Sequence, residues 1–580
     1  MSPNTSITYE PNLEITLRDG VKTYADLYKP SGPGKYPVLL CRTPYDKTSI
    51  ASKTGFLDAI KAAERGYAIV IQDVRGRFSS EGKFYAFTSE IEDGFDSVEW
   101  AASQNWSTGK VGMFGSSYVG ATQWLAAKAK PPSLIAIAPT VTASDYHNGW
   151  VWQGGAFELG FNLSWTASHV SANWPHLSEQ YDLPEEIEGH LIAARDSLTE
   201  NFHHLPLSEM ALFKQGFARY YYDWIDHPEY DEYWDSISIE KSHGNIDVPA
   251  LNIGGWYDIF LGGTLANFTG MQQNGPSEIA RNGQQLIIGP WVHGNTGILA
   301  GDFSFGTMSS RDSVGLQDHI LTFFDQWLKK DSPPSKATHP IKLFVMGENV
   351  WRDEEEWPPS RAKMTPYYLH SNGEANSLSG DGVLSKHKPH DEPHDVFMYN
   401  PQFPVPTTGG GLCCDPVFTR SGAYDQRWVE QRQDVLVYST PPLEEAIEVT
   451  GPIKVSLFAM TSAADTDFTA KLVDVDPSGY ARNLTDGIIR ARYRNSRIKA
   501  ELLNQGDIIE YEIDLWATSN LFQKDHLIRL EISSSNFPRF DRNLNTDADI
   551  GKDSKFVQAL QTVYHTRKYP SHILLPIIPR

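Results

Sequence analysis

The sequence predicts an α/β domain that is interrupted by a helical segment and followed by an antiparallel β domain. Three observations lead to this prediction. Continuous apolar runs alternate with helical segments early in the chain, which is typical of a parallel sheet covered on both faces. The alternation stops after Pro139 and returns near residue 248. Beyond residue 353, polar and apolar residues alternate with a period of two, which indicates antiparallel strands.

The first part of the α/β domain is expected at residues 1–144. Its buried strands are predicted where the chain forms continuous apolar runs, at residues 36–41, 67–72, 111–114 and 134–138. Helical segments separate these runs, at residues 56–65, 90–102 and 119–128. A loop rich in turn residues is expected after the second run, at residues 73–82.

Residues 145–240 are expected to form a helical cap inserted into this domain. They are rich in aromatic, histidine and acidic residues at helical spacing, without convincing strands. Strands return at residues 248–253 and 285–288, so the second part of the α/β domain is predicted at 241–352. Such a cap would lie over the carboxyl ends of the strands, where open α/β sheets bind ligands.

An acidic stretch that ends in prolines, residues 351–359, is predicted to be a linker. Residues 353–580 beyond it are predicted to form an antiparallel β-sandwich of the jelly-roll type, because short strands recur along them. The alternating segments that support this are residues 453–457, 468–475, 508–513 and 527–532.

The composition argues against several classes of partner. A chain of 580 residues is too long for a single core, so two or three domains are expected. The net charge of −22 and the lack of a basic cluster interleaved with aromatics disfavour nucleic acid and membrane surfaces as partners. No metal is expected, because His203 and His204 are adjacent rather than spaced for shared coordination and no His-Glu-x-x-His motif occurs.

The three cysteines are Cys41, Cys413 and Cys414. Their number is odd and two of them are adjacent, so no disulfide framework is expected, and buried packing is the default for the adjacent pair. The first ten residues are polar and no apolar stretch is long enough to span a membrane. A cytoplasmic location is the simplest expectation. Cap helices or sandwich edges would permit a homodimer.

The residues most informative about chemistry form a strand-to-helix turn at residues 110–120. A serine in so tight a turn has a strained backbone and an outward hydroxyl, and it faces the positive end of the following helix. Ser117 is preferred over Ser116 as the nucleophile because Gly115 stands two residues before it, where the chain passes close to the helix. Val119 replaces the usual second glycine, so a glycine-rich turn without catalytic function is the alternative interpretation.

A serine nucleophile needs a base, and the base needs an orienting acid. In α/β-hydrolases the order along the chain is Ser, acid, His, and each follows a strand of the sheet. Asp258 follows the strand at residues 250–253, and His293 follows the strand at residues 286–288. Each residue alone is ambiguous, but their joint order predicts the triad Ser117, Asp258 and His293.

The oxyanion of the tetrahedral intermediate needs preorganised donors. The backbone N–H of Tyr118, directly after the nucleophile, is one donor by position. Tyr45 ends the first buried strand, where such enzymes supply the second donor. Its phenol could donate a hydrogen bond, although a packed aromatic in a Pro-Tyr turn is an equal alternative.

With these residues in hand, the chain resembles the α/β-hydrolase family of bacterial cocaine esterase, which includes cephalosporin acylases, α-amino acid ester hydrolases and X-Pro dipeptidyl-peptidases. The resemblance implies an α/β-hydrolase fold with an inserted helical cap domain and a C-terminal jelly-roll β-sandwich. It also implies the same triad and an oxyanion hole of the Tyr45 hydroxyl and the Tyr118 amide. The matching motifs span nearly the whole chain, at residues 42–47, 72–76, 112–120, 255–258, 289–293, 344–347, 534–538 and 572–576.

The same resemblance implies an acyl pocket. Trp150 and Trp165 of the cap, Phe260 beside the acid, and Leu412 of the last domain match the family's pocket. Cys413 replaces the neighbouring aromatic residue, which puts a cocaine-type benzoyl substrate in doubt. Ordinary helix packing is the alternative for the two tryptophans.

These observations predict a serine carboxylesterase that works on small-molecule esters of aryl or bulky acids through an acyl-enzyme, without a cofactor. An amide hydrolase with the same triad, either a β-lactam acylase or an X-Pro dipeptidyl-peptidase, is the nearest alternative. The latter must bind an ammonium group, and we expect the acids of the cap not to do this. These acids are Asp223, Asp226, Glu229, Asp231 and Glu232. A glycan-binding jelly roll on a catalytically silent hydrolase fold is a third alternative.

Overall fold

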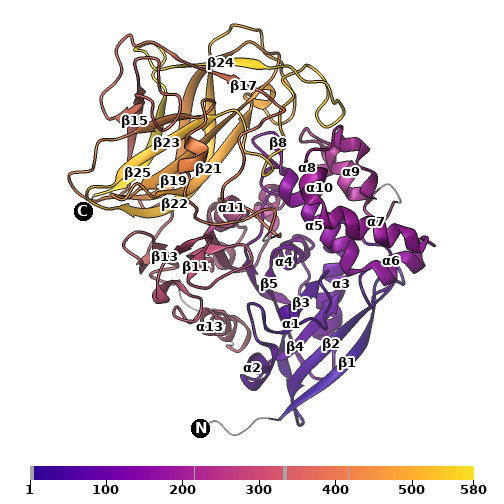
Figure 1. Ribbon diagram of the computed structural model, residues 1–580. Coiled ribbons are helices and arrows are strands. Elements are labelled where there is room, and N and C mark those ends of the chain that lie inside the picture. The colour runs from indigo at the N-terminus through magenta and orange to yellow at the C-terminus, as the bar shows by residue number, and fades with distance from the viewer. Residues whose placement is uncertain (1–5, 214–215, 331–335, 416, 580) are drawn as a thin grey trace.

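A ten-stranded sheet forms the core of the first domain in the computed structural model, which describes residues 6–213, 216–330, 336–415 and 417–579 (Figure 1). The strand order is β1-β2-β4-β3-β5-β6-β9-β10-β13-β14. The strands from β4 to β13 run parallel, and β1, β2 and β14 are antiparallel to their neighbours. The bounds are β1 (Ile7–Thr16), β2 (Lys22–Pro30), β3 (Tyr36–Thr43), β4 (Ala68–Asp73), β5 (Ser107–Ser116), β6 (Leu134–Thr140), β9 (Leu251–Tyr257), β10 (Gln285–Val292), β13 (Ile341–Val345) and β14 (Val350–Glu354).

Helices cover both faces of this sheet, which explains why its strands are continuous apolar runs. Successive side chains of a strand point to opposite faces. In β3, Val38 and Leu40 join the core under α3 (Glu90–Ser103) and α4 (Tyr118–Lys128), whereas Leu39 joins the core under α2 (Ala59–Glu64) and α13 (Leu316–Leu328). The remaining helical segments of the domain are α1 (Ile50–Thr54), α11 (Leu261–Asn274), α12 (Glu278–Asn282) and η4 (Thr307–Ser309), with a small hairpin of β11 (Leu299–Ala300) and β12 (Phe303–Ser304).

A mostly helical segment separates β6 from β9, at the place where the sequence predicted the cap. Figure 1 shows its helices, in magenta, to the right of α4 and beside the last domain. Its elements are β7 (Trp152–Gln153), β8 (Ala156–Phe157), α5 (Leu159–Ala172), α6 (Trp174–Gln180), α7 (Glu185–Asp196), α8 (Leu198–Phe202), η1 (Leu207–Glu209), η2 (Ala211–Phe213), α9 (Arg219–Asp226), α10 (Glu232–Ile237) and η3 (Glu240–Asn245).

The prediction that this segment contains no strands is wrong in one detail. The short strands β7 and β8 pair in an antiparallel hairpin. Gly154 and Gly155 form its turn with φ values of 55° and 84°, which favour glycine. A Cβ on Gly154 would lie 2.0 Å from the carbonyl oxygen of Ile488, so the turn also needs glycine to approach the last domain. Two-residue strands are too short to produce a period-two pattern.

The last domain is rich in strands and forms one connected network of eleven. The path runs β17-β24-β19-β25-β15-β16-β18-β23-β20-β21, and β22 pairs with β19. The predicted alternating segments lie in β19, β20, β22 and β23. The bounds are β15 (Lys363–His370), β16 (Val383–Ser385), β17 (Asp395–Tyr399), α14 (Arg427–Glu430), β18 (Leu436–Ser439), β19 (Ile447–Thr461), β20 (Asp467–Val475), β21 (Ala481–Arg490), η5 (Ala491–Tyr493), β22 (Ile509–Phe522), β23 (Leu527–Ser533), β24 (Ala559–Tyr564) and β25 (His572–Ile578).

The stretch predicted as a linker begins inside the first sheet. β14 pairs with β13 in register, with Val350 opposite Val345 and Glu354 opposite Ile341. The first sheet therefore continues past residue 352, because a tight hairpin after β13 adds β14 as its edge strand. Among the described residues, no helix has both the length and the apolar character that crossing a membrane would require.

A buried charge cluster joins the cap to the last domain. The Arg490 guanidinium, almost fully buried, donates to both carboxylate oxygens of Asp467 at 2.8 and 2.9 Å and to those of Asp541 at 2.9 and 3.1 Å. Asp541 in turn accepts from the backbone N–H of Phe157 at 2.7 Å. Arg490 also donates its backbone N–H to the carbonyl of Gly154 at 2.8 Å. The cluster therefore holds the β7–β8 hairpin against β21.

Replacing Arg490 by methionine is expected to destabilise the protein by about 3–5 kcal/mol, because two buried carboxylates lose their counterion. Arg427→Met is the matched control. Arg427 also binds an aspartate, Asp425, but both side chains are partly exposed, so a loss below about 1 kcal/mol is expected. Urea unfolding followed by tryptophan fluorescence measures both variants. Equal midpoints for the two variants would contradict the structural role of the cluster.

Candidate active site

Ser117 occupies the sharp turn between β5 and α4. Its φ of 61° and ψ of −125° are unusual for a residue other than glycine, and such strain is common at functional positions. The turn is possible only because its neighbours are small. A Cβ on Gly115 would lie 2.3 Å from Cγ1 of Val119, and one on Gly120 would lie 2.7 Å from Cβ of Thr142. The sequence therefore builds a tight turn that presents the serine hydroxyl.

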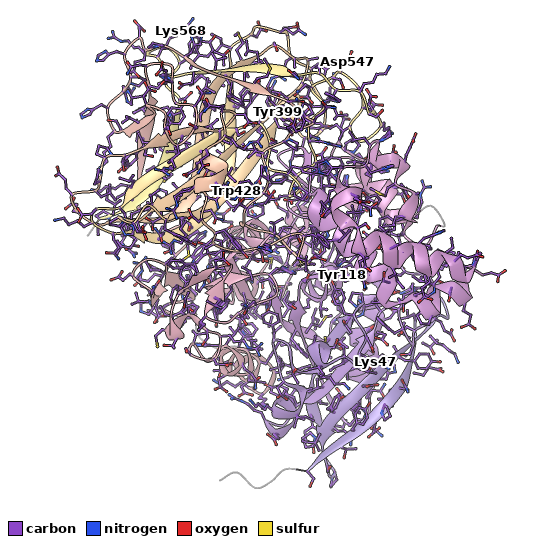
Figure 2. All side chains as sticks on the ribbon, viewed as in Figure 1. Lys47, Tyr118, Tyr399, Trp428, Asp547 and Lys568 are labelled. Atoms are coloured by element: carbon purple, nitrogen blue, oxygen red, sulfur yellow. A yellow bond between two sulfur atoms is a disulfide. The ribbon has the colours of Figure 1, made fainter. Side chains whose placement is uncertain are left out.

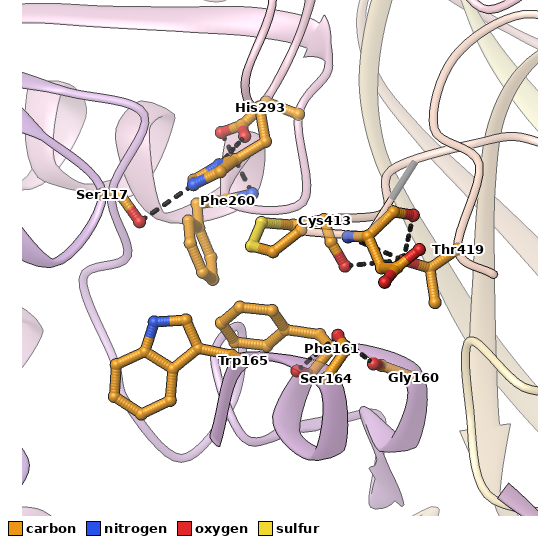
Figure 3. Close-up of a disulfide and its surroundings, with 12 residues drawn as sticks. Ser117, Gly160, Phe161, Ser164, Trp165, Phe260, His293, Cys413 and Thr419 are labelled. Atoms are coloured by element: carbon orange, nitrogen blue, oxygen red, sulfur yellow. Dashed lines mark hydrogen bonds and ion pairs between the residues drawn. A yellow bond between two sulfur atoms is a disulfide. The ribbon is translucent and has the colours of Figure 1, made fainter. Parts of the chain in front are cut away.

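The structure brings Ser117, His293 and Asp258 into one hydrogen-bonded chain. His293 Nε2 lies 2.9 Å from Ser117 Oγ, and His293 Nδ1 lies 2.6 Å from Asp258 Oδ1 (Figure 3). The second oxygen of Asp258 accepts from the backbone N–H of Phe260 at 3.1 Å. Asp258 follows β9 and His293 follows β10, so the three side chains meet at the carboxyl edge of the parallel strands.

Two hydrogen-bond donors face this chain. The N–H of Tyr118 belongs to the first turn of α4 and therefore has no acceptor within the helix. The Tyr45 hydroxyl accepts from Trp165 Nε1 at 3.0 Å, which leaves its own proton free to donate. Burial raises the pKa of Tyr45, although its hydrogen bonds with Trp165 and Ser117 oppose this, so the phenol stays protonated. The geometry suits both predicted members of an oxyanion hole.

The ring of Tyr118 fixes the position of that amide. Its hydroxyl donates to Glu90 at 3.1 Å and accepts from the backbone N–H of Phe87 at 2.9 Å. Glu90 is paired with the buried Arg42 at 2.8 Å. Tyr118 lies near the centre of the molecule (Figure 2), and its ring stacks against Trp165 of the cap. The cap and the sheet are therefore joined directly at the turn.

Tyr45→Phe is expected to lower kcat by about 10²–10³-fold, because one donor to the developing oxyanion is lost while the ring remains. KM should change much less, since the hydroxyl would act mainly in the transition state. Tyr220→Phe is the control, since this buried phenol is not among the residues that line the cavity beside Ser117. Steady-state kinetics on p-nitrophenyl esters measures both. An unchanged kcat in Tyr45→Phe would remove Tyr45 from the site.

A cavity of about 600 Å³ opens beside the serine, within the size range of small-molecule sites. It lies between the carboxyl edge of the sheet, the cap helix α5 and the loop that follows β10. The residues that line it include Tyr45, Phe56, Arg77, Phe78, Ser117, Trp165, His169, His293, Thr296, Arg311 and Cys414.

The four residues predicted for the acyl pocket lie at different depths. Trp165 lines the cavity directly. Trp150 and Phe260 are fully buried and stack on each other with ring centroids 4.2 Å apart. Phe260 also meets the ring of His293 edge-on at 5.1 Å, as Figure 3 illustrates. Leu412 is buried next to the cysteine pair and is not among the lining residues.

Cys413 and Cys414 form a disulfide, so the expectation of an unpaired cysteine pair is wrong (Figure 3). Adjacent cysteines are poor candidates for pairing in a regular strand or helix, but these two lie in an irregular loop. Cys413 is buried and Cys414 is exposed at the cavity. Both sulfur atoms lie within 4.8 Å of a His293 ring nitrogen. Because the sulfurs bond each other and both ring nitrogens have partners in the triad, these three residues offer no free ligand set for a metal.

The polar residues of the cavity wall that sequence reasoning missed include Arg77 and His169. Arg77 lies in the turn-rich loop after β4, and His169 lies in α5. The position of Arg77 after the carboxyl end of a parallel strand was a usable signal, because such loops share the edge that carries the site. No comparable signal in the sequence marks His169, since only the docking of α5 brings its side chain to the cavity.

Comparison with known proteins places this chain in a family. Residues 19–295 match the family described as X-Pro dipeptidyl-peptidase (S15 family), and residues 335–574 match the X-Pro dipeptidyl-peptidase C-terminal non-catalytic domain. Cocaine esterase of Rhodococcus sp. (strain MB1 Bresler) is 38% identical over 577 residues, which covers 98% of each chain.

Solved structures agree over the whole length. An α-amino acid ester hydrolase has a TM-score of 0.81 at 26% identity, covering 100% of this chain and 99% of its own. An aminopeptidase from a marine sediment Thaumarchaeota archaeon also has a TM-score of 0.81, at 25% identity, covering 100% and 98%. The resemblance predicted from the motifs is confirmed. The chain belongs to the X-Pro dipeptidyl-peptidase (S15) family of hydrolases, alongside cocaine esterase.

Proposed function

We propose that the protein is a serine carboxylesterase that hydrolyses small-molecule esters through an acyl-enzyme intermediate. The observation that carries this proposal is the hydrogen-bonded chain from Ser117 through His293 to Asp258, with distances of 2.9 and 2.6 Å. Two donors beside Ser117 and a cavity that opens onto it complete the requirements for acyl transfer.

In the acylation half-reaction, Ser117 Oγ attacks the ester carbonyl while His293 Nε2 takes its proton. The carbonyl oxygen becomes an oxyanion that the Tyr45 hydroxyl and the Tyr118 N–H stabilise. Asp258 holds the imidazole with its proton on Nδ1 and stabilises the imidazolium. His293 then gives the proton to the leaving alkoxide, and the C–O bond breaks to leave the acyl group on Ser117.

Deacylation repeats these steps with water as the nucleophile. His293 removes a proton from the water, the same two donors stabilise the second oxyanion, and the proton returns to Ser117 as the acid leaves. The chain's own residues supply every proton transfer and every charge stabilisation in this scheme.

Trp165 in the cavity wall and the apolar residues packed around it support an aryl or bulky acyl group as part of the substrate. Trp165 offers an aromatic surface, and the stacked pair Trp150 and Phe260 gives a rigid wall behind it. Leu412 adds apolar packing near the cysteine pair. Aromatic side chains bury large apolar areas, so such a wall favours bulky apolar groups over short polar ones.

Cleavage of amides by the same triad is the alternative, since the family includes peptidases. A dipeptidyl-peptidase must bind a substrate ammonium, and no carboxylate of the described residues lines the cavity beside Ser117. The acids of the cap have other partners. Asp223 pairs with Arg219, Asp231 with His227, and Glu229 accepts from the backbone N–H of Ala500. This distribution favours esters.

The division into domains is part of the proposal. We assign residues 1–144 and the segment from 241 to the end of β14 to the α/β-hydrolase domain, 145–240 to its cap, and the rest to a jelly-roll sandwich. The helices α5–α10 and the strand network of the last domain support this assignment. The cytoplasmic location and the homodimer expected from the sequence stay predictions.

A fluorophosphonate probe and a matched substrate pair test the function. Stoichiometric labelling of the protein at Ser117, found by peptide mass spectrometry, is expected together with rapid hydrolysis of a p-nitrophenyl ester. The absence of labelling would favour a binding protein on a silent hydrolase fold. Fast cleavage of a Xaa-Pro-p-nitroanilide with weak ester turnover would instead assign the peptidase alternative.

A further inference from the structure

The catalytic cavity has the opposite charge to the rest of the protein. The chain carries a net charge of −22, yet the charged side chains that line the cavity are two arginines, Arg77 and Arg311. No carboxylate of the described residues lines it. In the adjoining hollow that shares His293, one carboxylate, Asp415, is present, and it accepts backbone N–H groups of its own loop.

Arg77 is the more unusual of the two arginines. Only 1% of its surface is exposed, and no carboxylate of the described residues forms an ion pair with it. Its Nε donates to the carbonyl of Pro44 at 2.9 Å, and its Nη2 donates to the carbonyl of His169 at 3.0 Å. Its Nη1 has no hydrogen-bond partner among the described residues. The guanidinium is thus held in place with donor capacity to spare.

The one acid that acts on the Arg77 charge does so without an ion pair. Asp73 attracts the Arg77 guanidinium from a distance, but its carboxylate accepts from the Lys47 backbone N–H at 2.7 Å and from the Ser79 hydroxyl at 2.8 Å. Burial lowers the pKa of Arg77 to about 10, so the side chain stays charged at neutral pH. A buried charge without a counterion is costly, and an anion in the cavity would offset that cost.

Arg311 differs from Arg77 in its surroundings. It donates to the carbonyl of Gly55 and lies 3.8 Å from the carboxylate of its neighbour Asp312. Its side chain is 40% exposed, so water solvates its charge. Arg77 is therefore the buried cation of the cavity. The rings of Phe78 and Phe84 lie 5.0 and 5.5 Å from its guanidinium, but no carboxylate of the described residues pairs with it.

His169 stands beside Arg77, and its imidazole is a polar group of the cavity wall without a hydrogen-bond partner among the described residues. Its ring is buried against Trp165 with centroids 4.6 Å apart, and neither ring nitrogen has a hydrogen-bond partner among the described residues. Burial, with a smaller contribution from Arg77, holds the pKa of His169 well below its usual range, so the ring is neutral. A neutral imidazole can donate one hydrogen bond to an anion next to the guanidinium.

We propose that the cavity binds ester substrates that carry a carboxylate, with Arg77 as the group that recognises it and His169 as a second donor. The proposal rests on the proposed function, because Arg77, His169 and Ser117 line the same cavity. Arginine binds carboxylates through parallel N–H groups, which suits a planar anion better than a neutral ester or an ammonium. The substrate would be the half-ester of a dicarboxylic acid, or an ester of an alcohol that bears a carboxylate.

Two pairs of matched esters test this proposal and locate the carboxylate. The acyl pair is p-nitrophenyl hydrogen adipate and p-nitrophenyl methyl adipate. The alcohol pair is p-carboxyphenyl acetate and its methyl ester. In the wild type, kcat/KM should favour the anionic member of one pair by about 10–100-fold, the range for hydrogen bonds to charged groups. Arg77→Met should abolish that preference, whereas Arg311→Met should keep it.

The ratio within a pair separates recognition from structural damage. If Arg77 were merely structural, Arg77→Met would slow both members equally and leave the ratio unchanged, which would overturn the proposal. Equal rates for both members of both pairs in the wild type would also overturn it. Arg77→Lys keeps the charge and should keep part of the preference, so it replaces Arg77→Met if the latter does not fold. Failure of the wild type to hydrolyse any of the four esters would instead refute the proposed function.

Discussion

Ser117→Ala is expected to lower kcat for p-nitrophenyl ester hydrolysis by about 10⁶-fold, the size of loss seen when a hydrolase triad loses its nucleophile. The substitution removes only Oγ, the atom that lies 2.9 Å from His293 Nε2. No other hydroxyl has a hydrogen bond to His293 in the described residues. Alanine accepts the φ of 61° about as poorly as serine does, so the fold and the melting temperature should change little.

Ser116→Ala is the matched control, because Ser116 is the alternative nucleophile one residue earlier. Ser116 is the last residue of β5, pairs with Thr140 of β6 and lines the same cavity. Among the described residues, the hydroxyl that is hydrogen-bonded to His293 is that of Ser117 and not that of Ser116. The Ser116→Ala variant should retain most of the esterase activity and all of the fluorophosphonate labelling. Full activity in Ser117→Ala, or a loss of activity in Ser116→Ala alone, would refute the assignment of Ser117 as the nucleophile.

The positions of Ser117, Asp258 and His293 could be predicted because each residue directly follows a strand of the parallel sheet. Ser117, Asp258 and His293 each follow a strand of the parallel set, and the carboxyl ends of β5, β9 and β10 lie on one edge of the sheet. Apolar runs locate those strands in the sequence, since both faces of the sheet are buried. A polar residue directly after such a run therefore has a known place in space.

The walls of the cavity could not be predicted in the same way. His169 reaches the site through the docking of α5 against Tyr45 and Phe84, and no sequence pattern encodes that contact. Arg77 looks like an ordinary loop cation until its surroundings show that no carboxylate accompanies it. The disulfide between Cys413 and Cys414 depends on an irregular loop, whose conformation has no periodic signal. Charge compensation and loop geometry are properties of the packed structure.

Asp258→Asn is expected to lower kcat by about 10⁴-fold, as in triads where the acid becomes an amide. The reason is the tautomer of His293. In the wild type the Phe260 N–H donates to Asp258 Oδ2 at 3.1 Å, and the amide oxygen of the asparagine can accept this same bond. Its NH₂ group then faces His293 Nδ1, which lies 2.6 Å from Asp258 Oδ1. Nδ1 must then accept a hydrogen bond from this NH₂ group, so the ring proton of His293 moves to Nε2. Because Nε2 is already protonated, it can no longer take the proton of Ser117.

Asp415→Asn makes the same change of charge in the adjoining hollow, without touching His293, and should alter kcat by no more than a few-fold. The combined variant Ser117→Ala/Asp258→Asn should be no slower than Ser117→Ala alone, because groups that act as one unit give non-additive losses. Losses that multiply would mean that Asp258 contributes independently of the serine. A rate in Asp258→Asn within tenfold of the wild type would show that something other than this carboxylate orients the imidazole.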